Sequence, residues 1–383
     1  MKLVSNIVTY FRRLLRFIGP GFMVAVGYLD PGNWATDMEG GSQFGYRLLF
    51  IILISNFIAI FLQNLTIRLG TVNGLDLAAA CRRYLPKYLN LFLYVLAEIS
   101  IISTDLAEVI GSAIALNLLF PTLPLSAGVA ITALDVFIIL LFYKEPDSIS
   151  ASKNDDDNGD QDTTRMVRYF EMFVMLLVAA VGICFIIELA YSDIVAVDVL
   201  KGYLPSKEIF TDTESLYVSI GIIGATVMPH NLFLHSYIVQ ARCYSWRHVR
   251  PKLISNDLSE DDPQQHEADH IETTRTIQYS SQLLEDLDIS LLRHFLVDNM
   301  HINLHYSFMD LMVALLFAFF VNSAILIVAS ANFHYGHLHV VSDLFDAHAL
   351  LQQYLGPAAA VIFALALLFA GQSSTLTATL AGQ

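Results

Sequence analysis

The chain has 383 residues, of which 55% are hydrophobic and only 15% are charged, and its mean hydropathy is +0.55. Soluble globular chains carry charge at about a quarter of their positions, so this composition excludes an ordinary soluble protein and predicts a multispanning membrane protein. A membrane helix needs about 20 apolar residues. Eight such stretches can be placed, near residues 17–40, 47–69, 89–118, 124–143, 168–190, 216–240, 308–332 and 356–380.

The net charge of −15 is concentrated between these stretches. Half of the carboxylates fall in two tracts, from Glu145 to Asp162 and from Asp257 to Asp298. Both tracts are polar and of low complexity, so they bury too little apolar area to fold. We expect largely disordered acidic loops at 144–165 and 244–305; a trafficking or regulatory site within them is the alternative.

Basic residues gather in four places that lie on one side of the membrane if the spans alternate. The clusters are Lys2, Arg12, Arg13 and Arg16; Arg68, Arg82, Arg83 and Lys87; Arg165 and Arg168; and Arg242, Arg247, Arg250 and Lys252. The positive-inside rule then places the N-terminus and both acidic loops in the cytoplasm. With this count the sixth span runs inward while the first runs outward, which is the arrangement of inverted-repeat transporters.

Helix-breaking residues interrupt both of these spans. The first carries Asp30-Pro31-Gly32-Asn33, and the sixth carries Met228-Pro229-His230. Proline removes a backbone donor and glycine adopts conformations that other residues resist, so we expect both helices to unwind there. Unwound backbone at membrane depth is tolerated where it lines a cavity or meets other protein groups.

The side chains at the two breaks predict a cation site. An intramembrane Asp is costly and usually functional, and Asp30 would stand beside Asn33, Met228 and backbone carbonyls. Hard oxygen ligands alone suit Mg²⁺ or Ca²⁺, whereas a thioether adds affinity for softer metals, so Mn²⁺ or Fe²⁺ fits best. The alternative is a pair of ordinary proline kinks, with Met228 as core filler.

Five motifs in order along the chain resemble the Nramp/DMT family of proton-coupled divalent metal transporters. They are DPGNW (30–34), TDLAEVIG (104–111), MPHNLFLHS (228–236), FVNSAILIVA (320–329) and AGQSSTLTATLAGQ (370–383). The resemblance implies an all-α polytopic membrane protein with a LeuT-like inverted-repeat fold, in which helices 1 and 6 are broken. The repeats would cover about 17–190 and 216–383 of a single transporter domain.

The resemblance also implies roles for named residues. Asp30, Asn33, the Ala225 carbonyl and the Met228 sulfur would bind the metal, with Pro31, Gly32 and Pro229 breaking the helices. Asp105 and Glu108 match an acidic pair on the third span that the family associates with the proton route. His230 and His235 match two histidines of the sixth span, which are linked to proton coupling or to the shape of the pathway.

Physical chemistry supports a proton route through these four residues without deciding it. Asp105 and Glu108 are three residues apart and share one helix face, where two buried carboxyls hold protons that neither would hold alone; helix packing is the alternative. The two histidines can titrate near neutral pH, or can brace the unwound segment by hydrogen bonds. Asp37 and Glu39 either attract cations to the outer mouth or form a solvated helix end.

The chain departs from the family pattern at its end. It stops in the motif of the eighth span. Against the ten-helix core that the resemblance implies, we expect a fold truncated after helix 8, without two further helices. We predict symport of Mn²⁺ or Fe²⁺ with H⁺ into the cytoplasm, by alternating access, in the plasma membrane or an endosomal or vacuolar membrane. The alternatives are a non-transporting metal sensor or interaction protein and an inactive truncated fragment.

The expected partners are a divalent metal ion and the lipid bilayer, with the oligomeric state open. We expect no enzyme activity, no cofactor apart from the transported ions and no nucleic-acid partner. No G-x-S-x-G or H-E-x-x-H motif of a hydrolase is present in the sequence.

Overall fold

The computed structural model describes residues 10, 14, 19–73, 75–142, 172, 175–176, 179–192, 194–248, 272–335, 343–354 and 356–382. Within these ranges the chain is helical and contains no β-strand. The helices are α2 (Pro20–Val26), α3 (Pro31–Phe44), η1 (Gly45–Leu48), α4 (Leu49–Arg68), η2 (Leu69–Asn73), α5 (Leu77–Tyr84), α6 (Lys87–Leu119), α7 (Leu125–Phe142), an unlabelled apolar helix over Ala179–Tyr191, α9 (Ala196–Gly202), α10 (Lys207–Thr211), α11 (Thr213–Thr226), α12 (Pro229–His248), α14 (Glu272–Ala329), η3 (Ser330–His334), α15 (Leu344–Tyr354) and α16 (Pro357–Gly382).

Each predicted apolar stretch contains helix in its described part. Among the described residues, five helical runs are long and apolar enough to cross a membrane: Pro31–Asn73, Lys87–Leu119, Thr213–Val239, Met300–His334 and Pro357–Thr375. The first run spans 43 residues and takes in parts of two predicted stretches, because α3 continues through η1 into α4. Leu125–Leu134 and Ala179–Tyr191 are shorter apolar helices.

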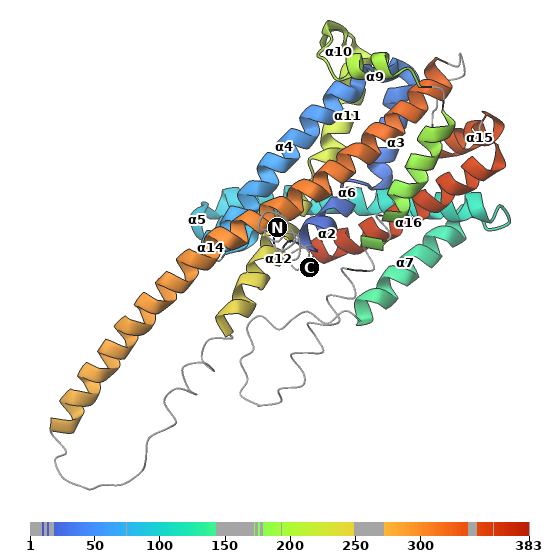
Figure 1. Ribbon diagram of the computed structural model, residues 1–383. Coiled ribbons are helices and arrows are strands. Elements are labelled where there is room, and N and C mark those ends of the chain that lie inside the picture. Colours follow the sequence, from blue (N-terminus) through green and yellow to red (C-terminus); the bar gives the residue numbers. More distant parts are fainter. Residues whose placement is uncertain are drawn as a thin grey trace, which may run out of the picture.

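The core forms where α14 crosses the bundle beside α2, α3 and α4 (Figure 1). Trp34 of α3 lies at its centre, with its ring centroid 4.7 Å from that of Phe185 and 5.6 Å from that of Phe363. Burial of an aromatic side chain of this size stabilises the fold by about 2–3 kcal/mol. These contacts attach the segment after Asp30 to the Ala179–Tyr191 helix and to α16.

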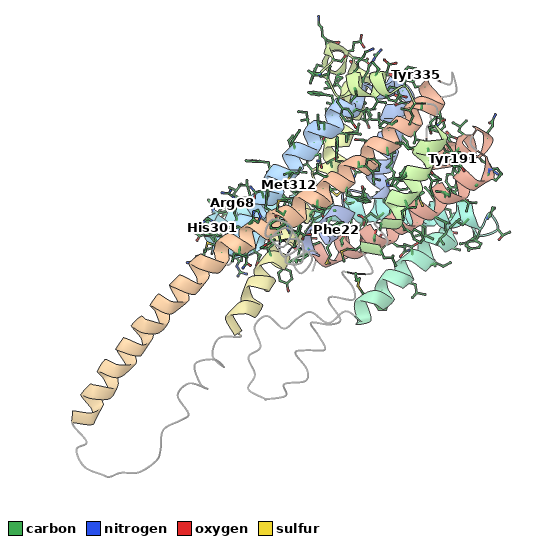
Figure 2. All side chains as sticks on the ribbon, viewed as in Figure 1. Phe22, Arg68, Tyr191, His301, Met312 and Tyr335 are labelled. Carbon is green, nitrogen blue, oxygen red and sulfur yellow. The ribbon has the colours of Figure 1, made fainter. Side chains whose placement is uncertain are left out.

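The lateral surface of the helical bundle is apolar along α6. Along the first half of α6, Tyr88, Phe92 and Leu96 are 91%, 59% and 47% exposed. A contiguous apolar surface of this kind is typical of contact with lipid. In Figure 2, His301 lies at the start of the membrane-length run formed by α14 and η3, and Tyr335 lies just past its end.

The second acidic loop differs from the sequence prediction. We expected a largely disordered segment over 244–305, whereas α12 extends to His248 and α14 begins at Glu272. Ile277, Leu284, Leu287 and Leu291 recur at helical spacing within the acidic tract, which favours helix over loop. Figure 1 shows this first part of α14 extending away from the other helices. The predicted loop at 144–165 lies outside the described residues.

Candidate metal centre

The first break separates α2 from α3 at Gly27 to Asp30. Its backbone turns through bonds between residues three apart, from Gly27 N to Val24 O (3.2 Å) and from Leu29 N to Val26 O (2.9 Å). Asp30 then caps α3, accepting the Asn33 backbone N–H at 2.9 Å. An acidic N-cap satisfies one of the donors that a helix start leaves unpaired.

Pro31 and Gly32 take different roles from those expected. Pro31 is the first residue of α3, where its missing N–H removes no hydrogen bond. The unwinding therefore lies before the proline rather than across it. Gly32 lies within α3 and has no positive φ. A Cβ there would lie 3.0 Å from Oδ2 of Asp30, so a larger residue would press on this carboxylate.

Side chains from other parts of the fold satisfy the carbonyls that the first break exposes. Asn322 donates its Nδ2 to Tyr28 O at 2.9 Å, and Trp34 donates its Nε1 to Leu29 O at 3.0 Å. Buried carbonyls without such partners would be destabilising. Sequence reasoning assigned no role to Asn322 or Trp34, although both stand in the motifs that carry the family resemblance.

The second break separates α11 from α12 at Val227 and Met228. Pro229 again begins the following helix, which repeats the arrangement at Pro31. The Met228 side chain is 4% exposed, and its sulfur accepts a hydrogen bond from Asn231 Nδ2 at 3.8 Å. The break thus places a buried thioether three residues after Ala225.

The two breaks meet at Asn33. Its Nδ2 donates to Asp30 Oδ1 at 2.5 Å and to Ala225 O at 3.1 Å. Its Oδ1 accepts a hydrogen bond from Thr226 Oγ1 at 3.3 Å. Asp30 and Asn33 are both 1% exposed. The structure therefore joins three of the four predicted metal ligands, Asp30, Asn33 and Ala225, by hydrogen bonds. The fourth, Met228, follows Ala225 by three residues.

The helices on either side of this contact run in opposite directions. Asn33 contacts Ala225, while Gly40, further along α3, faces Val218 and Ile222, which are earlier in α11. A Cβ at Gly40 would lie 3.5 Å from Val218 and 3.4 Å from Ile222. This antiparallel pairing of α3 with α11 agrees with the predicted opposite direction of the first and sixth spans.

The Asn33 amide shows what this arrangement can bind. Its NH₂ group carries partial positive charge and lies between a carboxylate oxygen and a carbonyl oxygen. A cation at the same place would interact with both oxygens, and rotation of the amide would turn Oδ1 towards it. Nitrogen and oxygen of an amide exchange places by such a rotation. With the predicted Met228 ligand added, the donors would be hard oxygens and one soft sulfur, a set that suits Mn²⁺ or Fe²⁺.

No group of three or more His, Cys, Asp or Glu side chains arranged to hold a metal is found within the described ranges. The predicted site contains only one such side chain, Asp30. Its remaining predicted donors are an amide, a carbonyl and a thioether, so a single carboxylate would balance part of the charge of a bound dication. A mixed set of this kind is compatible with reversible binding of a transported ion.

The acidic pair of α6 lies partly beside the first break. Glu108 is completely buried, with Oε1 accepting a hydrogen bond from Ser374 of α16. Oε2 has no hydrogen-bond partner in the described part of the chain. Pro31 packs closely against Gly111, which is one helical turn from Glu108. The contact is so close that a Cβ at Gly111 would overlap the Pro31 ring. Asp105 is half-buried and closer to the surface.

The two histidines of α12 have different surroundings. His235 Nδ1 lies 2.8 Å from Gln63 Oε1, and Gln63 Nε2 donates to the Tyr28 hydroxyl at 3.0 Å. These hydrogen bonds connect α12, through Gln63 of α4, to Tyr28 in the first break. His235 is therefore placed to brace the unwound segment, as one of the two predicted alternatives has it. His230 is also buried, and its Nδ1 has no hydrogen-bond partner among the described residues. Sequence reasoning did not select Gln63. The one signal that could have drawn attention to it is its position as a polar residue within an apolar stretch.

Asp37 does not form a solvated helix end. It is 1% exposed, and its Oδ2 has no hydrogen-bond partner within the described ranges. Asp37 lies seven residues after Asp30, which places both on nearly the same face of α3. Glu39 is half-buried and accepts a hydrogen bond from Gln43 Nε2 at 3.2 Å.

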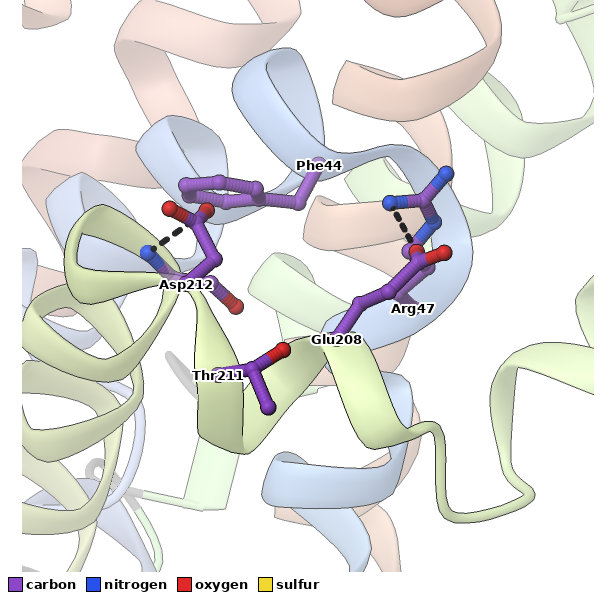
Figure 3. A pocket seen from close by; sticks show the side chains of 6 residues that line it. Phe44, Arg47, Glu208, Thr211 and Asp212 are labelled. Atoms are coloured by element: carbon purple, nitrogen blue, oxygen red, sulfur yellow. Dashed lines mark hydrogen bonds and ion pairs between the residues drawn. The ribbon is translucent and has the colours of Figure 1, made fainter.

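A pocket of about 420 Å³ opens at the end of the bundle that carries α9 and α10 (Figures 1 and 3). Its two acidic residues already have partners. Arg47 Nη1 lies 2.5 Å from Glu208 Oε2, and Asp212 Oδ2 accepts the Ser215 N–H at 3.3 Å, capping α11. The pocket therefore adds no uncommitted carboxylate to the metal centre.

Comparison with known proteins identifies the family. The model of the natural resistance-associated macrophage protein-like (Nramp) family matches residues 21–147 and 163–383. The divalent metal cation transporter MntH of Nostoc sp. is 44% identical over 381 residues, covering 99% of this chain and 70% of the relative. The manganese transporter SMF1 of Saccharomyces cerevisiae is 43% identical over 379 residues, covering 97% and 60% respectively.

The iron transporter SMF3 of the same yeast is 42% identical over 374 residues, covering 97% of this chain and 68% of its own. A crystal structure of the Eremococcus coleocola manganese transporter superposes with a TM-score of 0.69 at 32% identity, covering 98% of this chain and 65% of that one. The chain thus spans roughly two thirds of the length of these relatives. The predicted resemblance is confirmed: this chain belongs to the Nramp family.

Proposed function

We propose that the protein transports divalent transition-metal ions, Mn²⁺ or Fe²⁺, together with H⁺ into the cytoplasm. The observation that carries the proposal is the contact of both helix breaks at Asn33, whose amide bonds to Asp30 and to Ala225 O. A site shared by two half-helices can open to one side when one half moves. Such movement gives alternating access to a fixed midplane site.

Each ligand has a separate role in this proposal. Asp30 supplies the negative charge that compensates for partial dehydration of the dication. Asn33 and Ala225 supply neutral oxygens, one on each side of the contact between α3 and α11. Met228 supplies a sulfur that favours Mn²⁺ and Fe²⁺ over Ca²⁺, because Ca²⁺ prefers oxygen ligands.

The proposed architecture is the LeuT-like inverted repeat. Two features support it: a proline begins the second half of each broken helix, and α3 runs antiparallel to α11. The distribution of Lys and Arg supports a cytoplasmic N-terminus. The membrane would be the plasma membrane or an endosomal or vacuolar membrane.

Protons would move through Asp105, Glu108 and the α12 histidines. Glu108 supports this role because it is buried one turn from the residue on which Pro31 packs. A carboxyl in that position can hold a proton until the dication occupies Asp30, because the nearby positive charge then favours the ionised carboxylate and release of the proton. His230 is the second candidate, being buried in the first turn of α12.

The relatives support metal as the substrate. Two of them are a manganese transporter and an iron transporter, and a third is a divalent metal cation transporter. Because this chain spans about two thirds of their length, substrate, coupling and direction are proposals for it.

Uptake by proteoliposomes containing the 383-residue chain tests the proposal. Mn²⁺ should accumulate faster with an acidic exterior, and Asp30→Ala should abolish uptake. Glu108→Gln should retain Mn²⁺ binding while losing the acceleration by the pH gradient. Uptake that persists unchanged in Asp30→Ala would contradict the metal site. Equal acceleration in Glu108→Gln would contradict the proton route.

A further inference from the structure

A second asparagine, Asn231, contacts both helix breaks, at Met228 and at Gly27. It is in the first turn of α12, two residues after Pro229, and its side chain is completely buried. Its Nδ2 lies 3.8 Å from the Met228 sulfur, within hydrogen-bond distance for sulfur. Its Oδ1 has no hydrogen-bond partner among the described residues.

The same amide packs against the first break. A Cβ added to Gly27 would lie 2.8 Å from Asn231 Oδ1 and 2.9 Å from its Cγ, and closer still to Nδ2. Only glycine leaves room for the amide at this point. Asn231 is thus held between the unwound turn after α2 and the thioether at the start of α12.

A buried amide with an unpaired oxygen is a costly way to fill space. Leaving such an acceptor without a partner is destabilising, whereas an apolar side chain of similar size carries no such penalty. Packing against Gly27 alone therefore does not account for an amide at this position. The contact that requires an amide is the one with sulfur, which needs an N–H donor.

We propose that Asn231 is a positioning residue that sets the metal selectivity of the centre by orienting the Met228 sulfur. The inference rests on the proposed function. Methionine has three rotatable side-chain bonds and a thioether with two lone pairs. A donor on one lone pair fixes the side chain and directs the other lone pair to one side. Ordering the thioether before the ion arrives removes an entropy cost from binding.

The consequence depends on how much each ion uses sulfur. Cd²⁺ is the softest suitable probe and should depend most on an oriented thioether, Mn²⁺ less, and Ca²⁺ hardly at all. A residue that only fills space between the breaks would change the affinity for all three ions by the same factor. The ratio between ions separates orientation of sulfur from packing.

The test measures dissociation constants of Cd²⁺, Mn²⁺ and Ca²⁺ for the purified 383-residue chain in lipid nanodiscs by titration calorimetry. Asn231→Leu keeps most of the volume and removes the donor. Asn231→Ser is the second variant, for the case in which the leucine variant does not fold. Serine is too small to press on Gly27 and too short to reach the Met228 sulfur. Both changes are also made in a Met228→Ala background.

We expect the loss of one hydrogen bond to weaken Cd²⁺ binding about tenfold and Mn²⁺ binding about threefold, leaving Ca²⁺ unchanged. In the Met228→Ala background neither change at position 231 should weaken Cd²⁺ further. Equal losses for all three ions, or the same Cd²⁺ loss with and without Met228, would overturn the inference while leaving the metal site standing. A wild-type chain that binds neither Cd²⁺ nor Mn²⁺ would overturn the proposed function together with it.

Discussion

The two helix breaks share a design but differ in what they offer a metal. At each, a half-helix ends, two to four residues unwind, and a proline begins the next half-helix. In the first break the exposed carbonyls of Tyr28 and Leu29 are occupied by Asn322 and Trp34. In the second, Ala225 O bonds to Asn33, a predicted metal ligand.

The difference separates the two kinds of ligand. The first break is held in place by protein contacts and, in the proposed site, contributes the side chains of Asp30 and Asn33. The second would contribute a backbone oxygen, which is a neutral donor, and a sulfur, which is a soft one. In this proposal the charged ligand is held rigidly on one half-helix, and the neutral ligands are on another. The ion can then bind strongly while the two half-helices are together, and it is released when they move apart. Four substitutions would break or sharpen this comparison.

The largest effect is expected at Asp30. Asn is as good an N-cap as Asp, so Asp30→Asn should preserve the start of α3 while removing the one carboxylate among the four predicted ligands. We expect Mn²⁺ affinity to fall at least about 100-fold, because even supporting residues around metals are worth 10–100-fold. Titration calorimetry gives the affinity and thermal melting the stability. An affinity within threefold of wild type would show that the first break is not the charged half of the site.

Gly111 tests whether the first break is held rigidly. Gly111→Ala would force a methyl group into the Pro31 ring, and overpacking of this kind costs about 1–3 kcal/mol. We expect a lower melting temperature and weaker Mn²⁺ binding. Gly224→Ala in α11 is the matched control, because nothing lies within 4 Å of a Cβ there. Equal melting temperatures in the two variants would contradict close packing of α3 on α6.

Asn33 tests the connection between the breaks. Asn33→Ala removes both the contact with Ala225 O and the acceptor for Thr226 Oγ1. We expect Mn²⁺ affinity to fall about tenfold, close to the worth of one polar ligand. Thr226→Ala removes only the second of these bonds and should lower affinity by less than threefold. If the two variants behaved alike, Asn33 would act through Thr226 and not as a ligand.

His235 should have the smallest effect on metal binding. His235→Ala removes the bond to Gln63 that links α12 to Tyr28, at a cost of about 1 kcal/mol of stability. Mn²⁺ affinity at equilibrium should change by less than threefold, because His235 braces the second break without contacting the ion. Thermal melting and titration calorimetry on the same sample measure the loss of stability and the change in Mn²⁺ affinity. A tenfold loss of affinity at an unchanged melting temperature would make His235 part of the binding site.

Sequence reasoning could locate both breaks because Pro31 and Pro229 interrupt apolar stretches, and could select Asp30 because lipid makes a carboxylate there expensive. It could not locate Asn322, Gln63 or Ser374 as partners, since those contacts join residues far apart in the chain. It also placed the unwound turn too late, because a proline in sequence does not reveal whether it sits inside a helix or begins one. The first part of α14, from Glu272 to about residue 305, was predicted as loop because acidic composition outweighed the periodic leucines, whereas its apolar second part was predicted as a membrane helix.

The central claim, that both breaks bind one ion, is tested most directly by X-ray absorption spectroscopy at the Cd edge on the Cd²⁺-loaded chain. Sulfur scatters more strongly and lies farther from the metal than oxygen, so one thioether ligand is resolved from an oxygen shell. We predict one sulfur and several oxygen ligands in the wild type, with the sulfur lost and the oxygens kept in Met228→Ala. A fully loaded wild-type chain whose Cd²⁺ has oxygen ligands alone would contradict the account.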